Sequence, residues 1–190
     1  MKRSLFAYDY YRYYGNDRYS ILKKLFLGLP IELRFLCAFR MAQYYRNRKM
    51  CILQYLYWEL KKRRLAVKTH IQIPTITRIG KGLYIGHFGR VIVNPRAVLG
   101  NNITINTGVT IGQANRGKMQ GVPTIADNVW IGTNAVIVGG INVGTDVLIA
   151  PNAFVNFDVP PHSVVVGNPA KIISRENATD GYIERPVELS

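Results

Sequence analysis

His87 is the residue of this chain best suited to acid–base chemistry. It lies in the stretch LYIGHFGRV, residues 83–91, between Gly86 and Gly89. A neutral imidazole can take the proton of a hydroxyl group while the oxygen attacks a carbonyl carbon. The sequence offers no Ser, His and Asp in a recognisable triad order and no thiol suited to attack. Covalent catalysis by a nucleophilic side chain is therefore not expected.

Aliphatic side chains recur every six residues and define the elements that must position His87. Neither a helical period of 3.6 nor two-residue alternation keeps such positions in phase, whereas short strands stacked as the flat faces of a solenoid do. The period breaks between Val91 and Leu99 and between Ile111 and Ile125, which indicates extra residues at corners. The thirteen positions are Ile73, Ile79, Ile85, Val91, Leu99, Ile105, Ile111, Ile125, Ile131, Ile137, Val143, Ile149 and Val155.

The period also predicts which way the histidine faces. Ile85 takes the inward position of its hexad, so His87, two residues later, should project outward from the solenoid. The two flanking glycines keep the surrounding surface low, as expected around a group that must meet a substrate.

The repeat region resembles the left-handed β-helix of the hexapeptide acyltransferases, most closely their serine acetyltransferase-like branch. The resemblance rests on IADNVWIGTNAVIVGGINVGTDVLIAPNAFV (125–155) and on VPPHSVVVGNPAKII (159–173). The sequence also looks similar to bacterial O-acetyltransferases of capsule and surface-polysaccharide biosynthesis. The resemblance implies a mainly β protein, a parallel β-helix with an N-terminal α-helical region. It further implies a homotrimer with active sites between subunits.

We divide the chain into three regions. Residues 1–70 form a basic, tyrosine-rich α-helical region, in which helices are expected over 31–46 and 50–64 as a cap on the first coil. Residues 71–173 form the β-helix acyltransferase domain. Its loop, residues 112–124, should protrude as a flexible arm over a neighbouring site. The tail, residues 174–190, lacks the repeat and is expected to be exposed.

The resemblance assigns roles to individual residues. GHFGR stands where the family has its DHATG segment, so His87 aligns with the catalytic histidine. Acetyl-CoA is the implied co-substrate, and no metal is expected. Lys and Arg pair readily with the phosphates of coenzyme A, although the loop residues could equally be solvated and the groove residues mere corners. The candidate coenzyme-binding residues are Arg116, Lys118 and Lys171 for the phosphates, and Gly112 and Thr133 for the pantetheine groove.

Three departures from the family pattern bear on the acceptor. Gln72 replaces the aspartate fifteen residues before the histidine, Gly86 replaces the aspartate directly before it, and Gly121-Val122 replaces an Arg-His pair. Gln72 cannot carry the charge that would stabilise an imidazolium, so a backbone carbonyl is expected to orient the ring instead. The charges missing at the other two positions are those expected to hold a free amino acid, which favours a hydroxyl of a sugar or surface-polysaccharide precursor. Serine O-acetylation in cysteine biosynthesis is the alternative, and N-acetylation of an amino sugar remains open.

Positive charge is concentrated in the N-terminal region of the chain. Residues 1–70 hold 16 of the 25 Lys and Arg but 4 of the 11 Asp and Glu. A basic, aromatic surface suits anionic lipid, so peripheral membrane contact is a further hypothesis, as is a non-catalytic membrane- or nucleic-acid-binding solenoid. No apolar run approaches a membrane span, and Cys37 and Cys51 are expected to be reduced. We therefore expect a cytoplasmic protein, with a membrane-peripheral location as the alternative, and we expect no nucleic-acid partner.

His162 and His70 are the two remaining histidines. His162 follows two prolines at the end of the regular coils, where a structural role is expected. His70 precedes the first coil, and the sequence suggests no partner for it.

Overall fold

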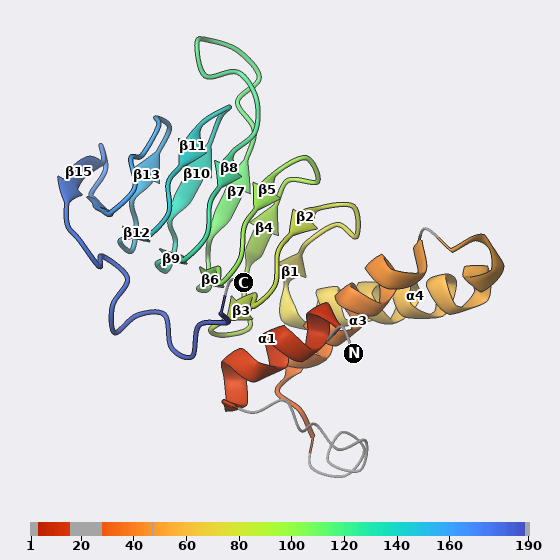
Figure 1. Cartoon of the computed structure of the whole chain (residues 1–190). Helices are drawn as coiled ribbons and strands as arrows, with labels where there is room; N and C mark the ends of the chain where they lie inside the picture. The colour runs from red at the N-terminus through yellow and green to blue at the C-terminus, as the bar shows by residue number, and fades with distance from the viewer. Residues whose placement is uncertain (1–3, 16–27, 47, 189–190) are drawn as a thin grey trace.

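The chain folds as a parallel β-solenoid with helices packed against its first coil (Figure 1). The computed structural model describes residues 4–15, 28–46 and 48–188. The predicted fold class, a mainly β chain with a parallel β-helix and an N-terminal α-helical region, is confirmed.

Short strands form the three flat faces of the solenoid, and neighbouring strands are parallel except for the final pair, β14 and β15. Face A consists of β1 (Ile71–Gln72), β4 (Val91–Val93), β7 (Thr110–Gly112), β10 (Val136–Val138) and β13 (Phe154–Val155). Face B consists of β2 (Arg78–Ile79), β5 (Val98–Leu99), β8 (Thr124–Ile125) and β11 (Asn142–Val143). Face C consists of β3 (Tyr84–Ile85), β6 (Thr104–Ile105), β9 (Val129–Ile131), β12 (Val147–Ile149), β14 (Ser163–Val166) and β15 (Lys171–Ser174).

Stacked aliphatic side chains fill the inside of the solenoid. On face C, Ile85 lies in register with Ile105, and the column continues through Ile131 and Ile149 to Val165. All thirteen positions of the six-residue period are buried, with at most 7% of any residue exposed. Each such burial contributes roughly 1.5–3 kcal/mol, so the repeat is the main source of stability in this domain.

The first break in the period lies at a different place from the one predicted. Val93, not Val91, stacks on Ile111 in face A. Eight residues therefore separate Ile85 from Val93, where six separate Ile105 from Ile111. The two extra residues therefore lie in the corner that carries His87. Val91 faces the inside of the solenoid as well as Val93, and both valines are buried.

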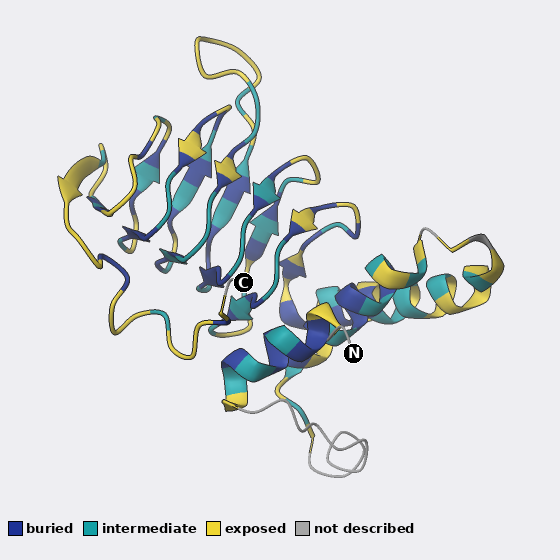
Figure 2. Cartoon of the chain, viewed as in Figure 1, coloured by how far each residue is buried: buried dark blue, intermediate teal, exposed yellow. Residues whose placement is uncertain are grey.

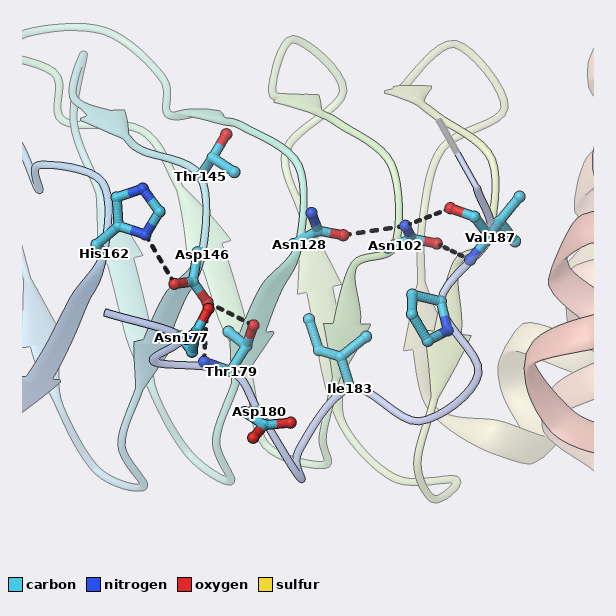
Figure 3. Close-up of a pocket in the computed structure, with 11 residues that line it drawn as sticks. Asn102, Asn128, Thr145, Asp146, His162, Asn177, Thr179, Asp180, Ile183 and Val187 are labelled. Carbon is cyan, nitrogen blue, oxygen red and sulfur yellow. Dashed lines mark hydrogen bonds and ion pairs between the residues drawn. The ribbon is translucent and has the colours of Figure 1, made fainter. Parts of the chain in front are cut away.

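The corners between faces B and C use a left-handed residue in successive coils. Asn102, Asn128, Asp146 and His162 have φ values of 54°, 55°, 55° and 53°. Asn and Asp tolerate this conformation better than most residues because their short polar side chains bond locally. We call these four residues the corner ladder. Their polar side chains point outward along one edge of the solenoid (Figure 3).

Three α-helices precede the solenoid in the described residues: α1 (Leu5–Tyr14), α3 (Ile31–Arg46) and α4 (Ile52–Thr69). A short 3-10 helix, η1 (Lys49–Cys51), leads into α4. The helix expected over 31–46 is confirmed. The second begins two residues later and ends five residues later than expected, where His70 adopts φ 58° as its C-cap. Figure 1 shows α1 and α3 against the first coil, and Phe35 and Phe39 are buried with the solenoid core, as predicted for a cap.

A buried ion pair ties two of the helices to the first coil. Arg40 of α3 bonds Asp9 of α1, Nε to Oδ2, at 2.7 Å, and both side chains are at most 2% exposed. Arg40 also donates to the carbonyls of Ile79 and Gly80, while Asp9 accepts from the amide of Leu83 at 2.8 Å. Burial raises the pKa of Asp9, and the charge and hydrogen bonds of Arg40 oppose that rise.

Residues 175–187 form a strap that runs back from β15 along the outer side of face C toward α1 (Figure 1). Most of its residues are exposed, as expected for the tail, but Ala178, Thr179 and Val187 are buried, so the segment is docked on the solenoid and does not extend away from it. The docking of the strap could not be predicted from the sequence, because the strap binds through polar and backbone groups and has no apolar period of its own.

The corner ladder anchors the strap at two points (Figure 3). Asp146 accepts hydrogen bonds from the amides of Ala178 and Thr179 at 3.0 and 2.9 Å, and from the Thr179 hydroxyl at 2.7 Å. Asn102 both accepts from the Val187 amide, at 2.8 Å, and donates to its carbonyl, at 2.9 Å. Between the anchors lies a pocket of about 740 Å³ that does not include His87.

The first anchor depends on pH through two groups. The predicted structural role of His162 is supported, since its Nδ1 lies 2.9 Å from Asp146 Oδ2. That hydrogen bond raises the pKa of His162 above its ordinary 6.5. Burial alone would raise the pKa of Asp146, but the hydrogen bonds from Thr179 and His162 outweigh it and lower that pKa below 3.8. The stabilisation from Asp146 is therefore lost in acid, and that from His162 as pH rises beyond 6.5.

Substituting Asp9→Ala should lower the free energy of unfolding by about 3–5 kcal/mol, because it leaves the Arg40 guanidinium buried without its counter-charge. Urea denaturation followed by circular dichroism measures the change. Glu188→Gln, at an exposed carboxylate, is the control and should stay within about 0.5 kcal/mol of the parent. A loss for Asp9→Ala no larger than the control's would contradict this account of the cap.

Raising the pH from 6 to 8 should destabilise the parent protein more than His162→Gln, because only the parent loses a protonated His162 beside Asp146. Thermal melting at the two pH values measures this difference. His70→Asn, which suits a left-handed C-cap, should keep the parent's pH dependence. An unchanged pH dependence in His162→Gln would show that this anchor does not titrate as argued.

Candidate active site at the His87 corner

His87 lies on the outer corner between β3 and β4. The side chain is exposed, while Ile85 is fully buried in the solenoid. The predicted outward direction is thus confirmed. Within the described residues, no hydrogen bond or ion pair to the His87 ring is found.

The helices hold the backbone of this corner in place. Glu32 of α3, a buried carboxylate, accepts a hydrogen bond from the Phe88 amide at 2.9 Å. The Gly89 amide donates to the carbonyl of Thr69, the last residue of α4, also at 2.9 Å. The Tyr13 hydroxyl of α1 lies 2.8 Å from the Ile85 carbonyl. Since each helix contributes a contact, the cap also fixes the position of the histidine.

Atoms of the next coil lie so close to Gly86 and Gly89 that a side chain at either position would overlap them. Gly89 has φ 139°, and a Cβ there would overlap the Thr107 hydroxyl. A Cβ on Gly86 would lie 2.6 Å from Asn106 Oδ1. Asn106 is held by a hydrogen bond from its Nδ2 to the Ile131 carbonyl at 2.9 Å. The space of a larger residue before the histidine is therefore taken by Asn106 of the next coil.

A pocket of about 200 Å³ opens beside the histidine. Its walls come from α1, from the outer side of face C and from the strap. The lining residues are Arg12, Tyr84, Gly86, His87, Thr104, Asn106, Trp130, Tyr182 and Glu184.

Two charged residues that the sequence analysis did not select lie in this pocket. Arg12 of α1 is buried and donates to the Glu184 carbonyl, the Gly82 carbonyl and the Thr104 hydroxyl, at 2.8, 2.8 and 2.9 Å. Burial lowers the pKa of Arg12 to about 10, which leaves it charged at neutral pH. The Glu184 side chain is 75% exposed. The Arg12 guanidinium is thus a buried cation in the pocket wall, and the exposed Glu184 carboxylate lies 3.9 Å from Nη1 of Arg185.

An aromatic pair forms another part of the pocket wall. Trp130 of β9 meets Tyr182 of the strap, with ring centroids 5.0 Å apart and ring planes at 64°. Tyr182 remains half-exposed. Such surfaces suit the apolar face of a ring or an alkyl chain, with the hydroxyl group free to bond.

The residues predicted for coenzyme binding are dispersed over the single chain. Thr133 follows β9 and lies on the same edge as His87, two coils along, which corresponds to about 10 Å. Gly112 ends β7 at the opposite edge of face A, where the loop leaves the solenoid (Figure 1). Arg116 and Lys118 lie in that loop and Lys171 begins β15, and all three are exposed.

Gln72, at the position where the family has the aspartate fifteen residues before the histidine, does not line the pocket. Gln72 is exposed on β1 of face A, paired with Ile92. No cluster of three or more His, Cys, Asp or Glu that could hold a metal ion occurs in the part of the chain that the structure describes.

Sequence reasoning missed Arg12, Glu184 and Tyr182 for one reason. They belong to segments outside the repeat, about 100 residues from His87 in the case of the strap. Only the return of the strap along face C brings them to the histidine.

No model of a known protein family matches the chain. The serine acetyltransferase of Helicobacter pylori is 38% identical over 108 residues, which is 57% of this chain and 63% of that protein. The chain covers between 29% and 63% of the lengths of the first curated relatives that it matches. The match therefore concerns part of those proteins.

Solved structures extend the similarity over most of this chain. The Brucella abortus serine acetyltransferase in complex with coenzyme A matches with a TM-score of 0.73 and 26% identity, over 90% of this chain and 67% of that one. The Neisseria gonorrhoeae serine acetyltransferase in complex with serine matches with a TM-score of 0.68 and 31% identity, over 90% of this chain and 68% of that one. The chain therefore belongs to the hexapeptide-repeat family of the serine acetyltransferases.

Proposed function

We propose that the protein is an acetyl-CoA-dependent O-acetyltransferase in which His87 is the general base. The observation that carries the proposal is the placement of His87: exposed, on a corner held by all three helices, at the mouth of a pocket. The relative solved with coenzyme A supports acetyl-CoA as the donor.

One proton moves twice in the reaction, first from the acceptor hydroxyl to His87 and then from His87 to the departing sulfur. The ring nitrogen of His87 takes the proton of the acceptor hydroxyl as its oxygen forms a bond to the thioester carbonyl carbon. The carbonyl oxygen becomes negative and requires hydrogen-bond donors. When the carbon–sulfur bond breaks, the sulfur leaves with the bonding electrons and takes the proton from the imidazolium, which yields coenzyme A and the acetyl ester.

The donor would lie along the edge that begins at His87. Thr133 on this edge suits the pantetheine chain, while exposed lysine and arginine side chains suit the phosphates. The remaining candidates, Gly112 with Arg116 and Lys118 of the loop, lie at the other edge of face A. They would serve a neighbouring subunit's site if the chain assembles as a homotrimer.

Serine is the first acceptor to test, because the relatives are named serine acetyltransferases and one of them was solved with serine. The exposed Glu184 carboxylate supplies a partial physical basis for it, because it can face the ammonium group of a free amino acid. It would take the place of the aspartate missing at Gly86. The Arg12 guanidinium is 2% exposed and already donates to three protein oxygens, so it can act on a bound carboxylate only through its charge.

A sugar hydroxyl is the second candidate acceptor, and the pocket wall favours it specifically. Trp130 and Tyr182 offer an aromatic surface that an amino acid as small as serine does not need. Asn106 occupies the space of the family's aspartate and presents an amide to the pocket, which suits neutral hydroxyl groups.

Substituting His87→Ala should lower kcat by about 100- to 10,000-fold, the usual contribution of a general base, with little change in stability because the side chain is exposed. Thiol release from acetyl-CoA measures the rate, with serine and with a panel of sugars, nucleotide sugars and oligosaccharides. His70→Asn, a second exposed histidine away from the pocket, should retain the parent rate. Equal rates for His87→Ala and the parent would exclude His87 as the base.

Substituting Gly86→Asp should lower kcat/KM for every acceptor, because its Cβ would lie 2.6 Å from Asn106 Oδ1 and the Asn106 side chain would have to move toward the pocket. Adding Asn106→Ala makes room, and kcat/KM for serine should then rise about tenfold relative to that for a sugar, the value of one hydrogen bond to a charged group. Asn106→Ala alone is the control. If the double variant changes both acceptors alike, residue 86 does not take part in acceptor choice.

A further inference from the structure

The helix α4 carries an apolar stripe that nothing in the described structure covers. Leu53, Tyr57, Leu60, Arg64 and Val67 follow one another at spacings of four and three, so they share one face of the helix. Leu53 and Val67 are each 76% exposed, and Leu60 is 54% exposed. The neighbouring Ile52 and Leu56 are exposed as well. Isolated exposed apolar residues are ordinary, but a continuous row indicates an interaction surface.

The opposite face of α4 accounts for its folding. Trp58, Lys62, Leu65 and Thr69 repeat with the same spacing, and this face packs against the rest of the protein. Lys62 is buried there through an ion pair with Glu59 at 3.0 Å. Since residues 60 and 62 lie about 200° apart around a helix, the exposed stripe points away from α3 and the solenoid. Figure 2 shows exposed residues along the part of the helix pair that projects from the solenoid.

The charges around the stripe are almost all positive. Arg64 lies within it, Lys61 and Lys68 flank one side and Arg63 the other. The one acidic residue of α4, Glu59, is already bonded to Lys62 and Arg63. Lys61 packs its ammonium over the rings of Tyr57 and Trp58, at 5.7 and 4.8 Å. Lysine and arginine side chains arranged in this way can lay their stems along an apolar surface and extend their charges outward.

We propose that α4 docks the protein on an anionic membrane surface, with the stripe inserted among the lipids and the flanking cations on the phosphates. The pattern of an apolar face bordered by Lys and Arg is that of interfacial helices. Each basic residue near an anionic leaflet adds about 1 kcal/mol of attraction. A second copy of the chain is the poorer occupant, because a symmetric contact would set these cations against one another.

The mode of attachment is peripheral. No helix in the described part of the chain combines the length and apolarity needed to cross a bilayer. No residue of α4 lines the His87 pocket, so docking through α4 does not occupy it. The inference is independent of the acetyl-transfer chemistry.

Co-sedimentation of the full chain with vesicles tests the proposal. Vesicles of phosphatidylcholine with phosphatidylglycerol should bind the protein, and vesicles of phosphatidylcholine alone or high salt should release most of it. Leu60→Ser and Arg64→Glu should each weaken binding about tenfold. Ile173→Ser on β15 and the exposed Arg175→Glu are the matched controls, at positions outside α4, and should bind as the parent does.

Two outcomes would overturn the proposal. One is that the parent does not bind anionic vesicles, or that it binds neutral vesicles equally well and the α4 variants bind as the parent does. The other is a fall in the molar mass of Leu60→Ser by light scattering together with no vesicle binding by the parent, which would assign the stripe to a contact between copies. Circular dichroism of each variant confirms that α4 is still folded.

Discussion

The register of the stacked aliphatic columns is the constraint on which the rest of the structure depends. Because each inward side chain must sit on its equivalent in the next coil, a slip of one residue would turn the apolar set outward. Corners therefore absorb every departure from the six-residue period. The loop between Ile111 and Ile125 and the two extra residues between Ile85 and Val93 are both corner insertions. The second insertion lies in the corner that carries the exposed His87, so the candidate base is found at an irregularity of the repeat.

The helical region serves the site as well as the fold. Asp9 and Arg40 close the first coil with a buried ion pair whose remaining bonds go to the solenoid backbone. Glu32 and Tyr13 then hold the backbone on either side of His87. A catalytic group on a surface corner needs such support, since an error of about 1 Å in its position can cost a large share of the rate.

The strap connects the two edges of face C. Its anchors at Asp146 and Asn102 belong to the corner ladder on one edge, whereas Tyr182 and Glu184 reach the pocket on the other. This arrangement changes the argument about the acceptor. The strap brings the Glu184 carboxylate to the pocket that lacks the family's aspartates, whereas the Arg12 guanidinium of α1 is buried in the pocket wall.

The sequence predicts the solenoid, the outward direction of His87, the helix α3 and the structural role of His162, because the six-residue period and the residues at the ends of helices and coils encode these features locally. It could not determine where the first period break falls, since Val91 and Val93 are equally apolar and only pairing with Ile111 distinguishes them. Nor could it place Arg12, Tyr182 and Glu184 beside His87. Those residues lie outside the repeat, and their position follows from hydrogen bonds between segments far apart in the chain, which leave no local pattern. Tertiary structure alone decided the composition of the pocket.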